Sequence, residues 1–160
     1  MPYAKNTHVS AARSKEEIER LVMRAGGRGF MSGVHDRDEV PHGVVGFELH
    51  DRRVLFELPL PARSEFANKV DGRSKRLRPN PRATDDWERA CREKWRALAL
   101  AIKAKLVSYE SKVETFEEAF LAQIVVPGKN KAVRFSTLAL PAISEAYSGK
   151  ALPPLLGGGT

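Results

Sequence analysis

VVGFELHDRRVLFELPL, residues 44–60, is the stretch of this 160-residue sequence that decides the fold. Apolar and polar residues alternate on both sides of Asp51-Arg52, which is typical of two strands joined by a tight turn. With these two residues at the tip, the apolar side chains that share one face form three cross-strand pairs: Leu49 with Val54, Phe47 with Phe56, and Val45 with Leu58. We therefore predict an antiparallel hairpin over about 44–60 that is buried on one side.

Helical and strand patterns precede the hairpin. Ser14 and Glu17 have the spacing of a capping box, and apolar residues follow at helical intervals until Gly26-Gly27. This pattern predicts an N-terminal helix over 15–25. The segment GFMSGVHD, residues 29–36, is expected to add a short strand to the sheet.

The longest periodic segment follows the hairpin. Thr84 is a candidate N-cap, and Asp85 and Asp86 are placed favourably for a first helical turn, so a helix is predicted over about 85–112. One side of it is an apolar stripe: Trp87, Cys91, Trp95, Leu98, Ile102, Leu106, Tyr109 and Val113. The far side is basic: Arg89, Arg92, Arg96 and Lys103. We expect both tryptophans, and Cys91 as a packed thiol, to belong to the core.

Shorter elements complete the chain. Thr115 and Glu118 form a second capping box before a helix through FEEAFLAQIV, 116–125. Residues 132–140 could form a strand, and 141–147 a short helix with proline at its start. The fold class is thus α+β, with one domain over 14–150 between flexible residues 1–13 and a flexible tail, 151–160.

Composition narrows the class of partner. An apolar content of 42% is enough for a core, and a net charge of +7 with a pI near 9.8 favours nucleic acid, an anionic membrane surface or an acidic protein. No long apolar run or apolar leader is visible, so we expect a cytoplasmic protein without membrane contact. The single cysteine, without a Cys/His finger pattern, indicates no disulfide, no structural zinc and no cofactor.

Most of the excess charge lies in one connection. Residues 63–82 carry seven basic and two acidic side chains, a net charge of +5, and RSKRLRPNPR (73–82) contains two prolines and no acid. If this segment folds back along the long helix, a continuous positive strip results, which suits phosphates at regular spacing. The predicted nucleic-acid-binding residues are Arg73, Lys75, Arg76, Arg78, Arg82, Arg89, Arg92, Arg96 and Lys103. The sequence contains no motif for reading bases.

A weaker candidate site lies on the polar side of the hairpin. In the predicted register Glu48 and Glu57 are diagonal neighbours, and His50 is close to them. Two carboxylates and an imidazole could hold a divalent ion for phosphodiester hydrolysis, but the sequence has none of the usual metal-ligand motifs. The histidines and acids of HDRDEVPH (35–42) are interpreted as a polar loop.

Several ordered blocks resemble a family of small proteins encoded by bacteriophages and prophages. They are FELPLP (56–61), WRALALAIKAKL (95–106), FEEAFLAQIVVPG (116–128) and LPPLL (152–156). The family has no established activity, so the resemblance implies only a bacterial cytoplasm and either handling of phage DNA or blocking of a host defence. The layout of helix, hairpin and long basic helix also resembles double-stranded-RNA-binding domains and the core of single-strand annealing proteins, which is an analogy of fold.

The sequence thus favours a non-enzymatic nucleic-acid-binding protein, an accessory factor in phage DNA replication, recombination or annealing. One alternative is an anti-defence protein that binds an acidic host protein or a nucleotide signal through the same positive surface. Another is a metal-dependent nuclease. DNA or RNA, single or double strand, and a homo-oligomer through the long apolar stripe all stay open.

Overall fold

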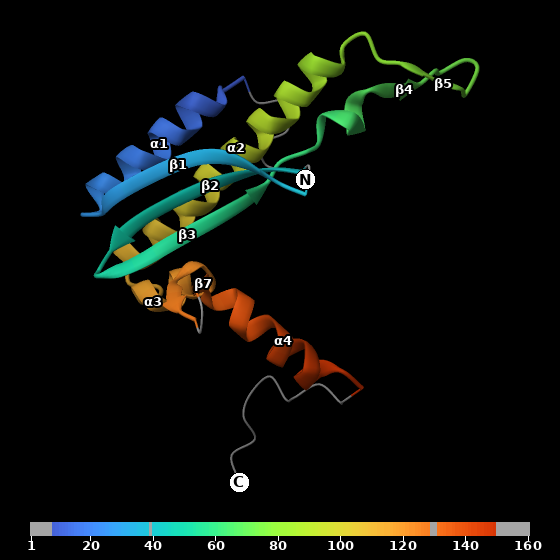
Figure 1. The fold of residues 1–160 in the computed structure, drawn as a ribbon. Coiled ribbons are helices and arrows are strands. Elements are labelled where there is room, and N and C mark those ends of the chain that lie inside the picture. Colours follow the sequence, from blue (N-terminus) through green and yellow to red (C-terminus); the bar gives the residue numbers. More distant parts are fainter. Residues whose placement is uncertain (1–7, 39, 129–130, 150–160) are drawn as a thin grey trace.

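The computed structural model describes residues 8–38, 40–128 and 131–149 and has the predicted α+β class. Its centre is a three-stranded antiparallel sheet in the order β1-β2-β3. The helices α1 and α2 lie side by side over one face of this sheet (Figure 1). The bounds of these five elements are α1 Ala11–Arg24, β1 Arg28–Arg37, β2 Val40–Leu49, β3 Arg52–Pro59 and α2 Ala83–Glu110.

The predicted hairpin forms, but with its register shifted by two residues. The tip is His50-Asp51, both with positive φ (50° and 55°), and Leu49 therefore pairs with Arg52. Histidine and aspartate tolerate the left-handed backbone that a tight hairpin turn needs, so the turn forms one residue earlier than Asp51-Arg52. Because a shift of two preserves the alternation of faces, the apolar side stays the inner side.

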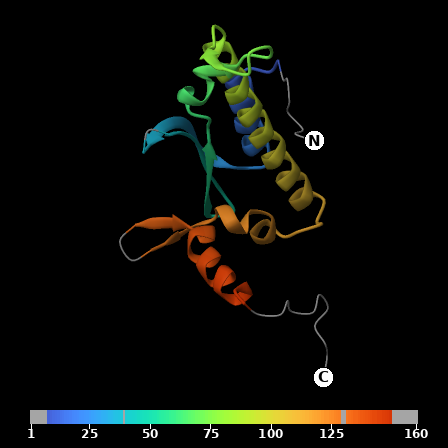
Figure 2. The same cartoon turned by 90° about the vertical axis from the view of Figure 1, so that its right-hand side faces the viewer.

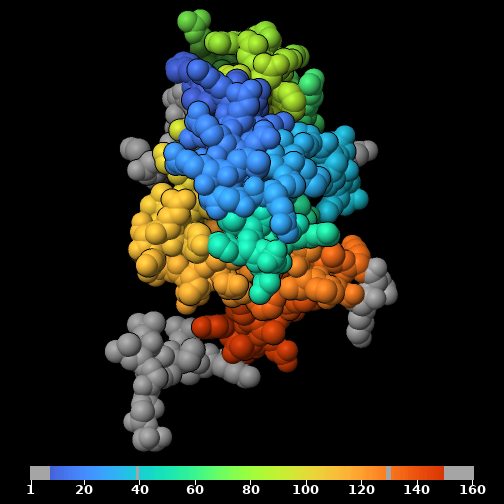
Figure 3. All heavy atoms as spheres, turned by 90° about the vertical axis from the view of Figure 1, so that its left-hand side faces the viewer, coloured from blue at the N-terminus to red at the C-terminus, as the bar shows by residue number. Residues whose placement is uncertain are grey.

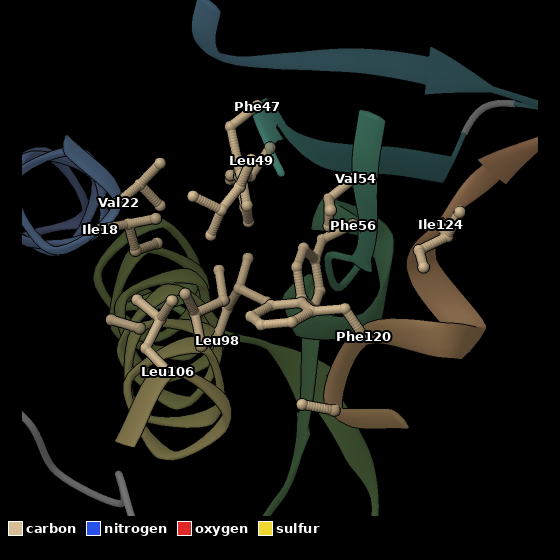
Figure 4. Packing of buried hydrophobic residues seen from close by; sticks show 14 of the residues in the cluster. Ile18, Val22, Phe47, Leu49, Val54, Phe56, Leu98, Leu106, Phe120 and Ile124 are labelled. Atoms are coloured by element: carbon tan, nitrogen blue, oxygen red, sulfur yellow. The ribbon is translucent and has the colours of Figure 1, made fainter. Parts of the chain in front are cut away.

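The helices α1, α2 and α3 cover the inner face of the sheet (Figure 4). Trp95 is fully enclosed near the centre, and Phe120 packs edge-on against Phe47 and Phe56 with ring centroids about 6 Å apart. The buried apolar residues are Ile18, Val22, Val45, Phe47, Leu49, Val54, Phe56, Leu60, Trp95, Leu98, Ala99, Ile102, Leu106, Phe116, Ala119, Phe120 and Ile124. Burial of this set is the main source of stability.

Two predicted N-caps are wrong. The N-cap of α1 is Ser10, whose side chain accepts from the Arg13 backbone, so residues 11–13 are helical. Ser14 is instead buried inside the helix. Helix α2 begins at Ala83 with Arg82 as N-cap, and Thr84 lies within its first turn. In both cases the helix starts one turn or less before the residue predicted as its N-cap.

The remaining elements are short. Their bounds are η1 Arg63–Phe66, β4 Asn68–Val70, β5 Leu77–Pro79, α3 Phe116–Phe120, η2 Leu121–Gln123, β6 Val125–Pro127, β7 Ala132–Arg134 and α4 Phe135–Tyr147. The capping box at Thr115 is confirmed, but its helix ends at Phe120, because Ile124 forms a bridge with Val54 at the edge of the sheet. Pro141 lies inside α4 instead of starting a helix.

Helix α4 projects from the end of the molecule opposite the β4–β5 hairpin (Figures 1 and 3). None of its described residues is buried, and Leu140, Ile143 and Tyr147 are each more than half exposed. None of the helices in the described ranges has the length and apolar character that a membrane span requires. The predicted flexible tail (151–160) and most of the predicted flexible N-terminus (residues 1–7) lie outside the described residues.

Candidate nucleic-acid interface

The basic connection contains an element that we call the ribbon, the β4–β5 hairpin of residues 68–79. Its strands pair Asn68 with Pro79, Lys69 with Arg78, and Val70 with Leu77. The ribbon extends beyond the N-terminal end of α2, away from the three-stranded sheet (Figures 1 and 2). All its residues are exposed except Asp71, which is half-buried. A thin, solvated arm of this kind has the shape to enter a groove of a nucleic acid or to lie along its phosphate backbone.

Asp71 holds the turn of the ribbon in shape. Its Oδ1 accepts hydrogen bonds from the backbone N–H groups of Arg73 and Ser74, both at 2.8 Å. The Asp71 backbone N–H donates to the Arg76 carbonyl, and the Lys75 N–H donates to the Asp71 carbonyl, both at 2.9 Å. Lys75 takes a positive φ of 55°. The backbone bonds from Ser74 and Arg73 lower the pKa of the Asp71 carboxyl, so it is ionised at neutral pH.

Asn80 fixes the base of the ribbon to the domain. Its side-chain Nδ2 donates to the Phe66 carbonyl of η1 and to Oδ2 of Asp86 in α2, each at 3.1 Å. Its backbone N–H donates to Ala67 at 2.9 Å, and its Oδ1 accepts from the Arg82 backbone. These bonds reach both η1 and the first turn of α2, and thereby set the direction in which the ribbon leaves the domain.

The ribbon concentrates positive charge. Five of its twelve residues are basic, namely Lys69, Arg73, Lys75, Arg76 and Arg78, and Asp71 is its one acid. Arg78 Nε lies 3.5 Å from Asp71 Oδ2, and since Arg78 is exposed while Asp71 is half-buried, solvent screens this pair in part and the carboxylate offsets part of the charge of Arg78. Arg82 adds an exposed cation at the start of α2, where the ribbon joins the helix. The structure therefore brings the five loop residues of the predicted site into one region.

A partly exposed aromatic group lies beside this region. Trp87 was predicted to be core, but it is only half-buried, at the N-terminal end of α2. Its Nε1 donates to the Pro61 carbonyl at 2.9 Å, and the Arg63 guanidinium lies 4.2 Å from its ring centroid. Trp95, in contrast, is buried as predicted.

The four basic residues predicted along α2 do not continue the ribbon. The ribbon does not fold back along the helix, and Lys103 is about 30 Å from the helix start at 1.5 Å per residue. Arg96 is paired with Glu17 of α1, and Arg89 lies 3.1 Å from Asp86, so a carboxylate offsets each charge. Arg92 is half-buried and Lys103 is exposed. The continuous positive strip is thus not formed.

The residues of the alternative metal site are also separated. Glu48 is opposite Arg53 and Glu57 is opposite Val44, so the predicted diagonal contact is wrong. Glu48 pairs with Arg28, and Glu57 pairs with Arg37 and Arg134. Within the described residues no group of three or more potential ligands could hold a metal ion.

His50 lies at the hairpin tip beside an open depression of about 580 Å³. Its Nε2 is 2.6 Å from the Tyr109 hydroxyl, and its ring contacts Phe116. This arrangement ties the hairpin tip to the C-terminal end of α2. Cys91 is half-buried, and desolvation raises the pKa of its thiol, which fits a packed thiol.

Sequence reasoning missed that the basic segment is a hairpin with an organised turn. The signal is Asp71-Gly72, a turn dipeptide between two short runs that each contain an apolar residue, Val70 and Leu77. Lys69 and Arg63 contribute to the net charge of this segment but are absent from the predicted site.

No protein-family model, curated protein or solved structure matches this chain.

Proposed function

We propose that this protein binds nucleic acid through the phosphate backbone, with the ribbon and the N-terminal end of α2 as the contact surface. The observation that carries the proposal is the projecting ribbon, in which five exposed cations surround one acid whose Oδ1 is engaged by the turn. Each phosphate that a cation neutralises releases condensed counterions, which favours binding at low salt.

The geometry suits backbone contacts better than base readout. Arginine predominates, and its planar guanidinium can bind phosphate in a bidentate way. Of the four basic residues predicted along α2, Arg89 and Arg96 are paired with acids, which makes this helix less suited than the ribbon to contact a nucleic acid. The sequence blocks that resemble small phage proteins imply either handling of phage DNA or blocking of a host defence. The ribbon favours the first, as an accessory role in phage DNA replication, recombination or annealing.

The first test is a fluorescence-anisotropy titration of labelled single- and double-stranded oligonucleotides at 50 and 200 mM salt. With about six phosphate contacts, affinity is expected to fall on the order of 10³-fold between the two salt concentrations. The variant Arg73→Gln/Lys75→Gln/Arg76→Gln is expected to reduce the slope of log affinity against log salt by about three, one for each lost contact.

A matched control removes the same charge elsewhere. The variant Arg20→Gln/Arg24→Gln/Lys103→Gln takes three exposed cations from the α1–α2 side of the domain. It is expected to keep the wild-type slope to within about one contact. Equal losses in both variants would show that total charge, not the ribbon, determines binding, and no salt-sensitive binding to either oligonucleotide would refute the proposal.

A further inference from the structure

The ribbon has two chemically different faces. In an antiparallel pair, residues directly opposite each other point to the same side and successive residues alternate. Lys69 and Arg78 therefore share one face, while Val70 and Leu77 share the other. Val70 is 56% exposed and Leu77 is 69% exposed, so this apolar pair meets solvent.

The apolar pair, Val70 and Leu77, does not belong to the hydrophobic core. Single exposed apolar residues are common on protein surfaces. Here two such residues are cross-strand partners in the last ladder pair before the turn, and Pro79 follows on the same face. They form an aliphatic edge on an arm whose base is joined to η1 and α2 through Asn80.

The ribbon is also held in a defined shape. Asp71 closes the turn with two side-chain hydrogen bonds, and Asn80 joins the base to η1 and α2. The apolar pair is therefore presented in a fixed orientation between cations of the turn and of the basic face. A pre-organised arm loses less conformational freedom when it inserts into a ligand.

We propose that the apolar face of the ribbon inserts between base pairs of duplex nucleic acid and bends it, while the surrounding cations hold the phosphates. This inference rests on the proposed function. Aliphatic and proline side chains act as wedges that unstack a base step from the minor groove and bend the duplex. The ribbon supplies Val70, Leu77 and Pro79 for this role.

Two other occupants fit the surface less well. Single strands are bound largely through stacking on aromatic rings. The ribbon contains none, and the ring of the neighbouring Trp87 already has the Arg63 guanidinium over it at 4.2 Å. A protein partner would bury the core of its interface, where charged residues and lysine in particular are depleted. Five of the twelve ribbon residues are basic, and Lys69, Arg76 and Arg78 are direct chain neighbours of the apolar pair.

The test uses a duplex of about 25 base pairs with a fluorophore at each end and 2-aminopurine at a central TA step, since such steps are easily unstacked. Binding is followed by anisotropy, bending by energy transfer between the ends, and unstacking by 2-aminopurine emission. Wild-type protein is expected to increase both energy transfer and emission as it binds. The variant Val70→Thr/Leu77→Thr, which keeps strand-forming residues, is expected to bind within about threefold of wild type but to lose both changes.

A matched control exchanges two apolar residues that are similarly exposed elsewhere. Met31 and Val34 in β1 are 59% and 53% exposed. The variant Met31→Thr/Val34→Thr is expected to bind and bend the duplex like wild type. Thermal melts of both variants check folding, since none of the four side chains is buried.

The outcomes separate the two proposals. Binding of wild type without bending or unstacking, or bending by Val70→Thr/Leu77→Thr equal to wild type, would overturn the wedge and leave backbone binding intact. Preference for a single strand over the duplex would also overturn it. No change in anisotropy at low salt would instead refute the proposed function itself.

Discussion

Asp71 supports the ribbon with its side chain while its charge opposes the binding of phosphates. Its lowered pKa lies below the ordinary value of 3.8, so the carboxylate is favoured in the folded ribbon. A depressed pKa contributes stability that is present above the unfolded pKa and is lost as pH falls through the folded pKa. At neutral pH the turn therefore keeps its full hydrogen bonding, together with one unfavourable negative charge.

These two effects can be separated by substitution. Asp71→Asn keeps an Oδ1 acceptor for the backbone N–H groups of Arg73 and Ser74 but removes the negative charge. Because one repulsive charge is lost near the solvent, duplex affinity is expected to rise by about two- to fivefold. Asp71→Ala removes the same charge and also the turn acceptor, and is expected to bind more weakly than Asp71→Asn.

Anisotropy titrations of both variants at 50 mM salt measure the difference. Equal affinities for Asp71→Asn and Asp71→Ala would mean that the turn geometry makes no contribution to binding. Amide hydrogen exchange at Lys75 gives an independent readout, because its N–H donates to the Asp71 carbonyl at 2.9 Å.

Among the elements, β2 and α2 approach each other closely at Gly43. Gly43 is buried in β2, and a Cβ added there would lie 2.7 Å from Cζ2 of Trp95, whose side chain is enclosed by the core. Glycine is therefore required by close approach of the helix. Gly33, in the neighbouring strand β1, has no atom within 4 Å of such a Cβ.

This contrast gives a matched pair of substitutions. Gly43→Ala overpacks the core and is expected to lower the free energy of unfolding by about 1–3 kcal/mol. Gly33→Ala meets open space and is expected to change it by less than about 0.5 kcal/mol. Urea unfolding followed by tryptophan fluorescence measures both. A Gly43→Ala protein as stable as Gly33→Ala would show that Trp95 can move away.

The same elements show what the sequence could predict. Alternation identified the inner face of β2 and β3, because a two-residue change in register leaves the faces unchanged. It could not locate the turn, since His50 and Asp51 adopt positive φ without glycine. Helical periodicity identified α2 but not its start at Ala83, because Asn80, not Thr84, organises the entry to the helix.

The candidate site was predicted in part, for a similar reason. The basic segment could be located from the sequence, because its high density of charge comes from residues that are close together in the chain. The partner of Arg89 is local, since Asp86 lies three residues earlier in the same helix. The partner of Arg96 could not be predicted, because Glu17 is 79 residues away in the chain and becomes its neighbour only when α1 packs on α2. A basic helix face offers free cations only where no acid from a distant part of the chain packs against it, and the sequence pattern of the helix does not show this.

At the scale of the whole molecule, folding and the proposed binding are located in different parts of the chain. The core is built from α1, α2, α3 and the three-stranded sheet, whereas no residue of the ribbon is buried. The ribbon lies at one end of the molecule and α4 at the other (Figure 1). The domain lies between them, and Asn80 sets the direction of the ribbon through its bonds to η1 and α2.

The binding element is therefore expected to be removable. Because Asn68 and Pro79 are cross-strand partners, an Asn-Gly turn can replace residues 69–78 while Asn80 and its bonds are kept. The shortened protein is expected to melt within about 4 °C of wild type, the shift that about 1 kcal/mol gives in a domain of this size, since it loses no buried side chain. It is also expected to lose salt-dependent binding in the anisotropy titration. Loss of a cooperative melting transition would show that the ribbon is needed for folding. Binding that persists with the wild-type salt slope would place the phosphate contacts on another surface, such as the side of α1 and α2 that carries Arg92 and Lys103.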